Sequence, residues 1–193
     1  EDVSTLKGLD DFSRVGEYYM LAVEPAEQGY NASYIYCDEE TMYIARDQMK
    51  LLEGRLPQKE DEVVVSRYFL SNYGADAGIG EKVMLSSESF HGEYTVTGIM
   101  EGYKEKEVNG TSILLSKEAL KGWSGYDPAD YRAYVHFKNE QQMDETELTA
   151  RSREIAKEYQ LEMPIMNLSY MKFYKQPVNV SMLALVAMAW GSS

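Results

Sequence analysis

Side chains that could do chemistry are few in this sequence, and they are scattered. The only histidines are His91 and His136, and the only cysteine is Cys37. Neither histidine lies within four residues of the other or of the cysteine, so the spacing of a zinc site is absent. Cys37 precedes the acidic run 38–40, whose charges disfavour a thiolate. We therefore expect these three side chains to play no catalytic or metal-binding part.

Carboxylates are more numerous, and they gather in two runs, residues 38–40 and residues 60–62. Such groups could act as an acid and a base, or they could bind calcium. Adjacent residues of an extended chain point to opposite faces, however, and neither run has the alternating spacing of a calcium loop. The sequence also has neither a nucleophile elbow nor a glycine-rich phosphate loop. We predict no catalytic residue, no cofactor and no metal.

The composition is that of a folded, acidic domain. Of the 193 residues, 44% are hydrophobic and 12% are aromatic, which is enough for a sizeable core. The formal net charge is −13, and the lysines and arginines are spread along the chain. Because such a surface repels phosphate groups, we exclude nucleic acid as a partner.

The elements that must position these side chains are short strands and short helices, which together predict an α+β fold. The clearest helix start is Asp144 followed by Glu147, which is the pattern of a capping box. With strands on either side of it, this helix would form a strand–helix–strand unit packed on a sheet. The expected strands are 17–24, 30–37, 41–44, 62–66, 80–85, 94–100, 112–116, 131–137 and 164–171. The expected helices are 3–14, a short helix in 67–78 that ends at Gly74, 117–123 and 144–160.

The end of the sequence is apolar. Residues 180–190 carry no charge, and as a helix these eleven residues would rise about 16 Å, roughly half of a bilayer core. We interpret residues 181–190 as the start of a truncated transmembrane helix and residues 191–193 as an appended tail. A buried helix in the same place is the alternative.

Five aromatic residues could form a surface that binds a partner. Three of them follow the valine-rich strand closely, and the other two lie near predicted loops. Aromatic residues at helical spacing are more often part of a core, so both readings stay open. The residues are Tyr68, Phe69, Tyr73, Phe90 and Tyr103.

The middle of the chain contains a succession of short motifs. LLEGRLP is followed by EVVVS, a short helix, GIGEKVML, a polar hairpin and YTVTGIM. Gly98, inside the last strand, predicts a bulge or the close approach of another backbone. This order resembles the MacB-like periplasmic core domain of MacB/FtsX-type ABC transporter permeases, most clearly over residues 50–101. The matching residues are Gly54, Arg55, Pro57, Glu62, Gly78, Gly80 and Gly98.

The resemblance implies two lobes. A membrane-proximal, Porter-like α/β lobe would comprise residues 1–49 and 128–180, and a β-rich, Sabre-like lobe, residues 50–127, would be inserted in it. Both chain ends would then return to the membrane. Arg55 is expected to pair with a carboxylate or a carbonyl group where the lobes join, and Glu62 is expected to begin the first strand of the inserted lobe.

A domain of this family would lie outside the cell membrane of a bacterium, anchored in it and without catalytic activity. Its partners would be a cytoplasmic ATPase subunit, reached through the missing transmembrane part, and an extracytoplasmic protein, peptide or lipid-like substrate. A cell-wall-hydrolase regulator is one such protein. The alternatives are an extracellular ligand-sensing domain of a membrane receptor, which needs a pocket with convergent polar groups, and a secreted enzyme, for which the site chemistry is missing.

Overall fold

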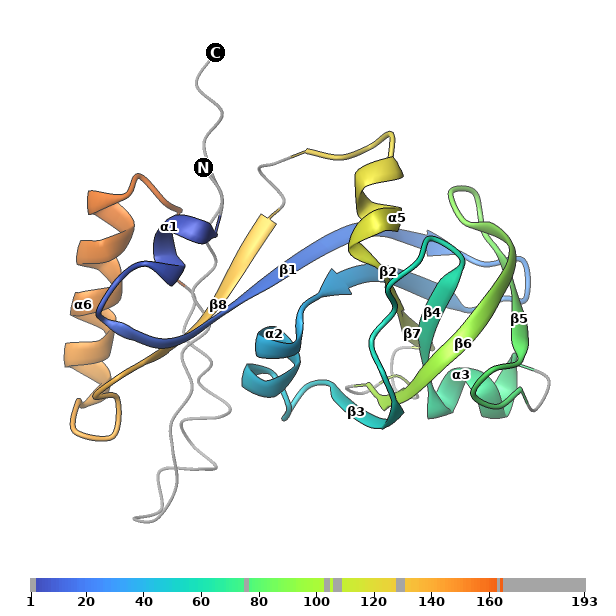
Figure 1. Ribbon diagram of the computed structural model, residues 1–193, viewed down its shortest axis with the longest axis horizontal. Helices are drawn as coiled ribbons and strands as arrows, with labels where there is room; N and C mark the ends of the chain where they lie inside the picture. The colour runs from blue at the N-terminus through green and yellow to red at the C-terminus, as the bar shows by residue number, and fades with distance from the viewer. Residues whose placement is uncertain are drawn as a thin grey trace. The chain divides into compact units, whose positions relative to one another are not determined.

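The computed structural model describes residues 3–74, 77–102, 105, 109–127, 131–162 and 164 (Figure 1). They form two compact units. Unit 1 takes the described residues of Glu1–Tyr18, Glu39–Ala45 and Asp127–Ser193, and unit 2 takes those of Tyr19–Asp38 and Arg46–Tyr126. Residues 19–38 belong to unit 2, where strand β2 pairs with β7.

Unit 2 is built on a mixed sheet with the strand order β3-β6-β4-β7-β2-β1, and β5 also pairs with β6. The pairs β2–β7 and β4–β6 are parallel, whereas β3–β6, β4–β7 and β5–β6 are antiparallel. Every residue of β4 is buried, which explains its continuous valine run. The elements are the second half of β1 (Phe12–Pro25), β2 (Asn31–Cys37), β3 (Lys50–Gly54), β4 (Glu62–Ser66), α3 (Arg67–Asn72), β5 (Lys82–Ser86), β6 (His91–Glu101), β7 (Gly110–Leu115) and α5 (Lys117–Gly122).

Unit 1 is organised around β8, which pairs with β1. On one face of β8, Ala133, Val135 and Phe137 join the core formed with α1 and α6. On the other face, Tyr134 packs against Ile44 of α2. The alternation in the sequence of this strand therefore corresponds to two packed faces. The elements are α1 (Ser4–Lys7), the first half of β1, α2 (Glu39–Ile44), β8 (Tyr131–Phe137) and α6 (Glu145–Glu158).

The prediction of a strand at residues 41–44 is wrong, because these residues belong to helix α2. The Thr41 hydroxyl donates a hydrogen bond to the carbonyl oxygen of Glu17 at 2.8 Å. A Cβ atom at Gly16 would lie only 2.3 Å from the Thr41 nitrogen. The sequence of this short apolar run fits either a helix or a strand, and close packing on β1 selects the helix.

The predicted start of α6 is confirmed. The Asp144 side chain accepts a hydrogen bond from the Glu147 N–H, and the Glu147 side chain accepts one from the Asp144 N–H. At the other end of the chain, the expected strand 164–171, the expected membrane segment 181–190 and the tail 191–193 lie outside the described residues, apart from residue 164. Among the described helices, none has the length and hydropathy needed to cross a bilayer.

Candidate functional site

One buried carboxylate organises the connection between β3 and β4. The Glu62 side chain, at the start of β4, is only 8% exposed. Arg55 donates to its two oxygens at 2.8 and 2.7 Å, and the backbone N–H groups of Gln58 and Lys59 donate at 2.8 and 3.3 Å. The Arg55 bonds and these N–H bonds outweigh desolvation and lower the pKa of Glu62 to about 2. The carboxylate is therefore charged at neutral pH and fixes the loop.

Two glycines let the same loop cross β6. Gly54 has φ +79°, and a Cβ atom there would lie 2.2 Å from the carbonyl oxygen of Thr97. A Cβ atom at Gly98 would lie 2.8 Å from the Arg55 carbonyl oxygen. The β4–β6 register shifts between Val63 and Val64 so that Thr97 is left over, which is the bulge predicted at Gly98. Side chains at these two glycines would push the strands apart.

The remaining motif residues shape the turn into β5. The Gly78 N–H donates to the Glu81 carboxylate at 2.6 Å. Gly80 has φ +89°, and its N–H donates to the Val96 carbonyl oxygen at 2.8 Å. A Cβ atom at Gly80 would touch nothing, so the positive φ angle is the reason for glycine there. Pro57 is half-buried in the β3–β4 loop.

The five aromatic residues do not form one exposed surface. Phe69 is 1% exposed and Phe90 is 7% exposed, so of the two readings left open by the sequence, these two rings follow the core one. Tyr68 and Tyr73 are half-buried. Tyr103 lies outside the described residues.

Contacts between distant parts of the sequence explain this burial. The Phe90 ring stacks on Trp123 with centroids 5.1 Å apart, and it lies 4.2 Å from the ring of Tyr34. Tyr73 packs on Tyr30 at 4.4 Å. Tyr30 and Tyr34 lie at or near β2, far in sequence from their partners, so the spacing of aromatics along the chain could not reveal these clusters.

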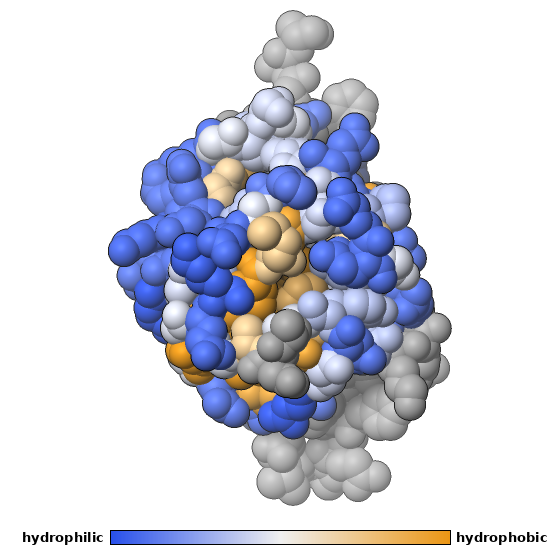
Figure 2. All heavy atoms as spheres, turned by 90° about the vertical axis from the view of Figure 1, so that its right-hand side faces the viewer, coloured by the Kyte–Doolittle hydropathy of each residue, from blue (hydrophilic) through white to orange (hydrophobic). Residues whose placement is uncertain are grey.

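Unit 2 exposes aliphatic side chains instead. Val23 of β1 is 60% exposed, Met84 of β5 is 49% exposed, and Ile79 is 46% exposed. Figure 2 shows apolar surface in a hollow bordered by hydrophilic side chains, on the side where β5 and β6 lie in Figure 1. Exposed apolar surface inside a polar rim is typical of a contact surface. The sequence analysis did not predict this apolar surface. The signal was the alternation along β5, where Met84 stands between two residues that point into the core and must therefore point outward.

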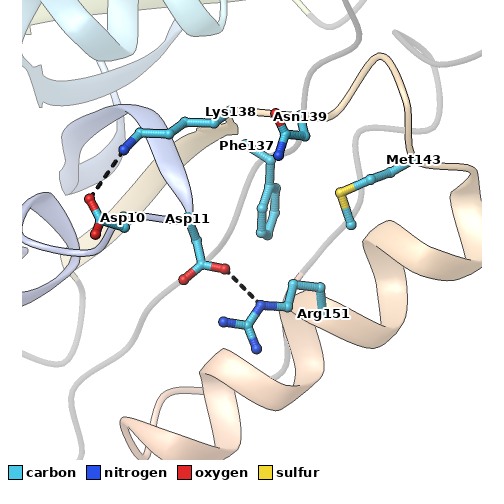
Figure 3. Close-up of a pocket in the computed structure, with 7 residues that line it drawn as sticks. All are labelled: Asp10, Asp11, Phe137, Lys138, Asn139, Met143 and Arg151. Atoms are coloured by element: carbon cyan, nitrogen blue, oxygen red, sulfur yellow. Dashed lines mark hydrogen bonds and ion pairs between the residues drawn. The ribbon is translucent and has the colours of Figure 1, made fainter.

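Unit 1 contains a cavity of about 360 Å³ (Figure 3). It lies where β1 begins, β8 ends and α6 passes. Arg151 donates through Nε to the Asp11 carboxylate at 2.7 Å, and the Lys138 ammonium lies 3.3 Å from a carboxylate oxygen of Asp10. The Arg151 hydrogen bond is the main cause that lowers the pKa of Asp11. Phe137, Asn139 and Met143 complete the lining.

Solved structures that are similar to this chain include the following two. The extracellular domain of the noncanonic ABC-type transporter YknZ from Gram-positive bacteria has a TM-score of 0.55 and 16% identity, with 83% of each chain covered. A domain of a protein described as a permease, from Porphyromonas gingivalis, has a TM-score of 0.51 and 15% identity, with 80% of this chain and 74% of that chain covered. A scan of family models and a search of curated proteins give no match.

The chain has the fold of an extracytoplasmic ABC-permease domain. The resemblance seen in the sequence is therefore confirmed at the level of fold, and so is the predicted α+β class, which takes the form of a large mixed sheet with few helices. In this permease-domain fold, the Arg55–Glu62 pair and the glycine crossing form one structural site that holds the β3–β4 loop against β6. Hydrogen bonds within the chain hold the Glu62 carboxylate, which therefore has a positioning role.

The other groups with reactive potential lie apart in the permease-domain fold. Cys37 is 2% exposed, and burial raises the pKa of its thiol. His136 is buried beside Tyr43, with Nδ1 4.0 Å from a Glu140 carboxylate oxygen, whereas His91 is exposed. Within the described residues, no three histidine, cysteine, aspartate or glutamate side chains are grouped as a metal site requires.

Proposed function

We propose that the chain is the extracytoplasmic domain of a bacterial ABC transporter permease. It lies outside the cell membrane and performs no catalysis. It couples ATP hydrolysis by a cytoplasmic ATPase subunit to work on a substrate or partner outside the membrane. The observation that carries this proposal is the likeness to the YknZ extracellular domain, which covers 83% of both chains.

The course of the chain supports the proposal. Helices α1 and α6, the first and last described helices, belong to unit 1, as does α2, whereas strands β2 to β7 belong to unit 2. Unit 2 thus lies in the sequence between the first and last segments of unit 1, in two stretches on either side of α2, which suits a lobe inserted in a body attached to the membrane at both ends. We assign unit 1 to the membrane-proximal, Porter-like lobe and unit 2 to the Sabre-like lobe.

The exposed apolar residues of unit 2 suit contact with the extracytoplasmic partner. The partner classes that fit are a protein, a peptide or a lipid-like substrate, since each can cover aliphatic surface. The polar rim seen in Figure 2 would then keep the uncovered domain soluble.

Cysteine labelling of the full-length gene product tests the proposal. Lys121 on α5 has a side chain that is 64% exposed, so Lys121→Cys presents a reactive thiol, while Cys37 stays buried and unlabelled. We expect a membrane-impermeant maleimide to label the variant in intact cells and an ATPase subunit to co-purify with it. Labelling only after lysis, or a full-length product without an ATPase partner, would refute the proposal.

A ligand-sensing domain of a membrane receptor is the second candidate. One observation favours it, namely the cavity of about 360 Å³ in unit 1, where charged and apolar groups converge. A receptor would connect its transmembrane span to a signalling module. Sequencing the gene beyond both ends of this chain separates the candidates, because a permease adds several spans and a receptor adds a kinase or a similar module.

A further inference from the structure

The cavity in unit 1 combines two charges of each sign with an apolar surface. Its carboxylates are Asp10 and Asp11, its cations are Lys138 and Arg151, and Phe137 and Met143 supply the apolar part. We propose that this cavity binds a small zwitterion in which a primary ammonium and an anionic group are joined by a short alkyl segment. A volume of about 360 Å³ is at the small end of the range for ligand sites.

The two ion pairs at the cavity differ in how easily they can open. The Lys138 side chain is 50% exposed and its partner Asp10 is fully exposed, so their pair at 3.3 Å is solvated and weak. The Arg151–Asp11 pair is shorter, at 2.7 Å, with side chains 38% and 28% exposed. Arg151 is also bound to Glu154 at 3.0 Å. A ligand would therefore displace the first pair and leave the second intact.

This exchange decides the charge of the ligand. When Lys138 turns from Asp10 to the anionic group of a zwitterion, the ligand's ammonium can take the freed Asp10 carboxylate. Each charge then keeps an opposite partner. A simple anion would lie beside two carboxylates, and a simple cation beside Lys138 and Arg151, so either would meet repulsion.

The same groups define the two ends of the ligand. Carboxylate oxygens only accept hydrogen bonds, so a primary ammonium, with three N–H donors, fits Asp10 better than a quaternary ammonium does. The Lys138 ammonium and the Asn139 side-chain amide can donate to a phosphate or a carboxylate. Phe137 and Met143 can cover the alkyl segment. Free amino compounds and the phosphoethanolamine headgroup of a lipid share this chemistry.

Titration of the 193-residue chain with O-phosphoethanolamine tests the inference, followed by the amide signals of the cavity residues in NMR spectra. We expect saturable binding in the millimolar range and about tenfold weaker binding of O-phosphocholine. Lys138→Met and Asp10→Asn change exposed side chains and should each weaken binding about tenfold. Lys121→Met is the matched control, since Lys121 forms an exposed pair with Glu118 in unit 2, and it should change nothing.

Vesicle co-sedimentation distinguishes the two sources of the ligand. Retention on phosphatidylethanolamine vesicles but not on phosphatidylcholine vesicles, lost in Lys138→Met, identifies the lipid headgroup. Binding of the free compound without vesicle retention identifies a soluble zwitterion. The inference is overturned if phosphoethanolamine does not bind at about 20 mM, if phosphocholine binds equally well, or if Lys138→Met binds normally with an unchanged circular dichroism spectrum. Such a result leaves the transporter proposal standing, because that proposal rests on the likeness to the YknZ extracellular domain and not on the cavity.

Discussion

The buried carboxylate of Glu62 gives the sharpest test of how the β3–β4 loop is held. Glu62→Gln keeps the size of the side chain and an oxygen for the Gln58 and Lys59 N–H groups, but it removes the charge that binds Arg55. The pKa of Glu62 falls from 4.5 to about 2, and a shift of this size corresponds to about 3 kcal/mol. Because Arg55 is 49% exposed, solvent screens the pair. We expect a loss of about 2 kcal/mol in the free energy of unfolding at pH 7.

The loss should depend on pH in a defined direction. The folded state lowers the pKa of this carboxyl group, so it binds the proton less tightly than the unfolded chain does. The stabilisation is complete above about pH 4.5 and disappears as the pH falls toward about 2. The free energies of unfolding of the unsubstituted chain and of Glu62→Gln should therefore converge over this interval.

Urea unfolding followed by tryptophan fluorescence measures the effect. Trp123 lies in unit 2 and stacks on Phe90, so a Trp190→Phe background leaves one emitter, in the same unit as the Arg55–Glu62 pair. Glu93→Gln is the matched control, because the Glu93–Lys82 pair is exposed on both sides and should contribute little. Equal losses in the two variants, or a difference that persists unchanged to pH 2, would show that the Arg55–Glu62 pair does not hold the loop.

Three further predictions concern other parts of the chain. Gly54→Ala should destabilise unit 2 by about 3 kcal/mol or more in the same urea assay, because it adds a clash to the strain of a positive φ angle. The control is Gly29→Ala, which should lose only about 1 kcal/mol, because Gly29 has φ +86° but open space around it. Equal losses in the two variants would contradict the crossing geometry. Cys37 should react with a thiol reagent only after unfolding, since it is buried and burial raises its pKa; rapid labelling of the folded chain would show that it is accessible. Asp144→Ala should lower the stability of unit 1 by about 1 kcal/mol, because it removes the capping box of α6. The loss is measured as a shift of the thermal midpoint, and an unchanged midpoint would mean that the cap contributes nothing.

Local patterns predicted most of the elements. The strand at 62–66 and the strand at 131–137 appear with the predicted bounds. The capping pattern at Asp144 marks the start of α6. Each of these signals lies within a few residues, where hydrogen bonding and side-chain alternation act directly on the backbone.

The kind of group that pairs with Arg55, a carboxylate or a carbonyl, was also predictable, but the residue that supplies it was not. The structure identifies Glu62 as the partner, seven residues away, because the loop turns back on itself over the Gly54–Gly98 crossing. Burial of Phe90 could not be predicted from its neighbours in the sequence, because the rings that pack on it belong to the distant residues Trp123 and Tyr34.

The sequence by itself determined the α+β class, the rhythm of most strands and the succession of motifs typical of permease domains, because these depend on composition and on short-range spacing. Tertiary structure alone decided that residues 41–44 are helical, that residues 19–38 belong to unit 2, and that charges just before β1, just after β8 and on α6 converge on one cavity. The physical reason is that burial and ion pairing depend on which distant segments meet, and many arrangements in space are compatible with the same local pattern.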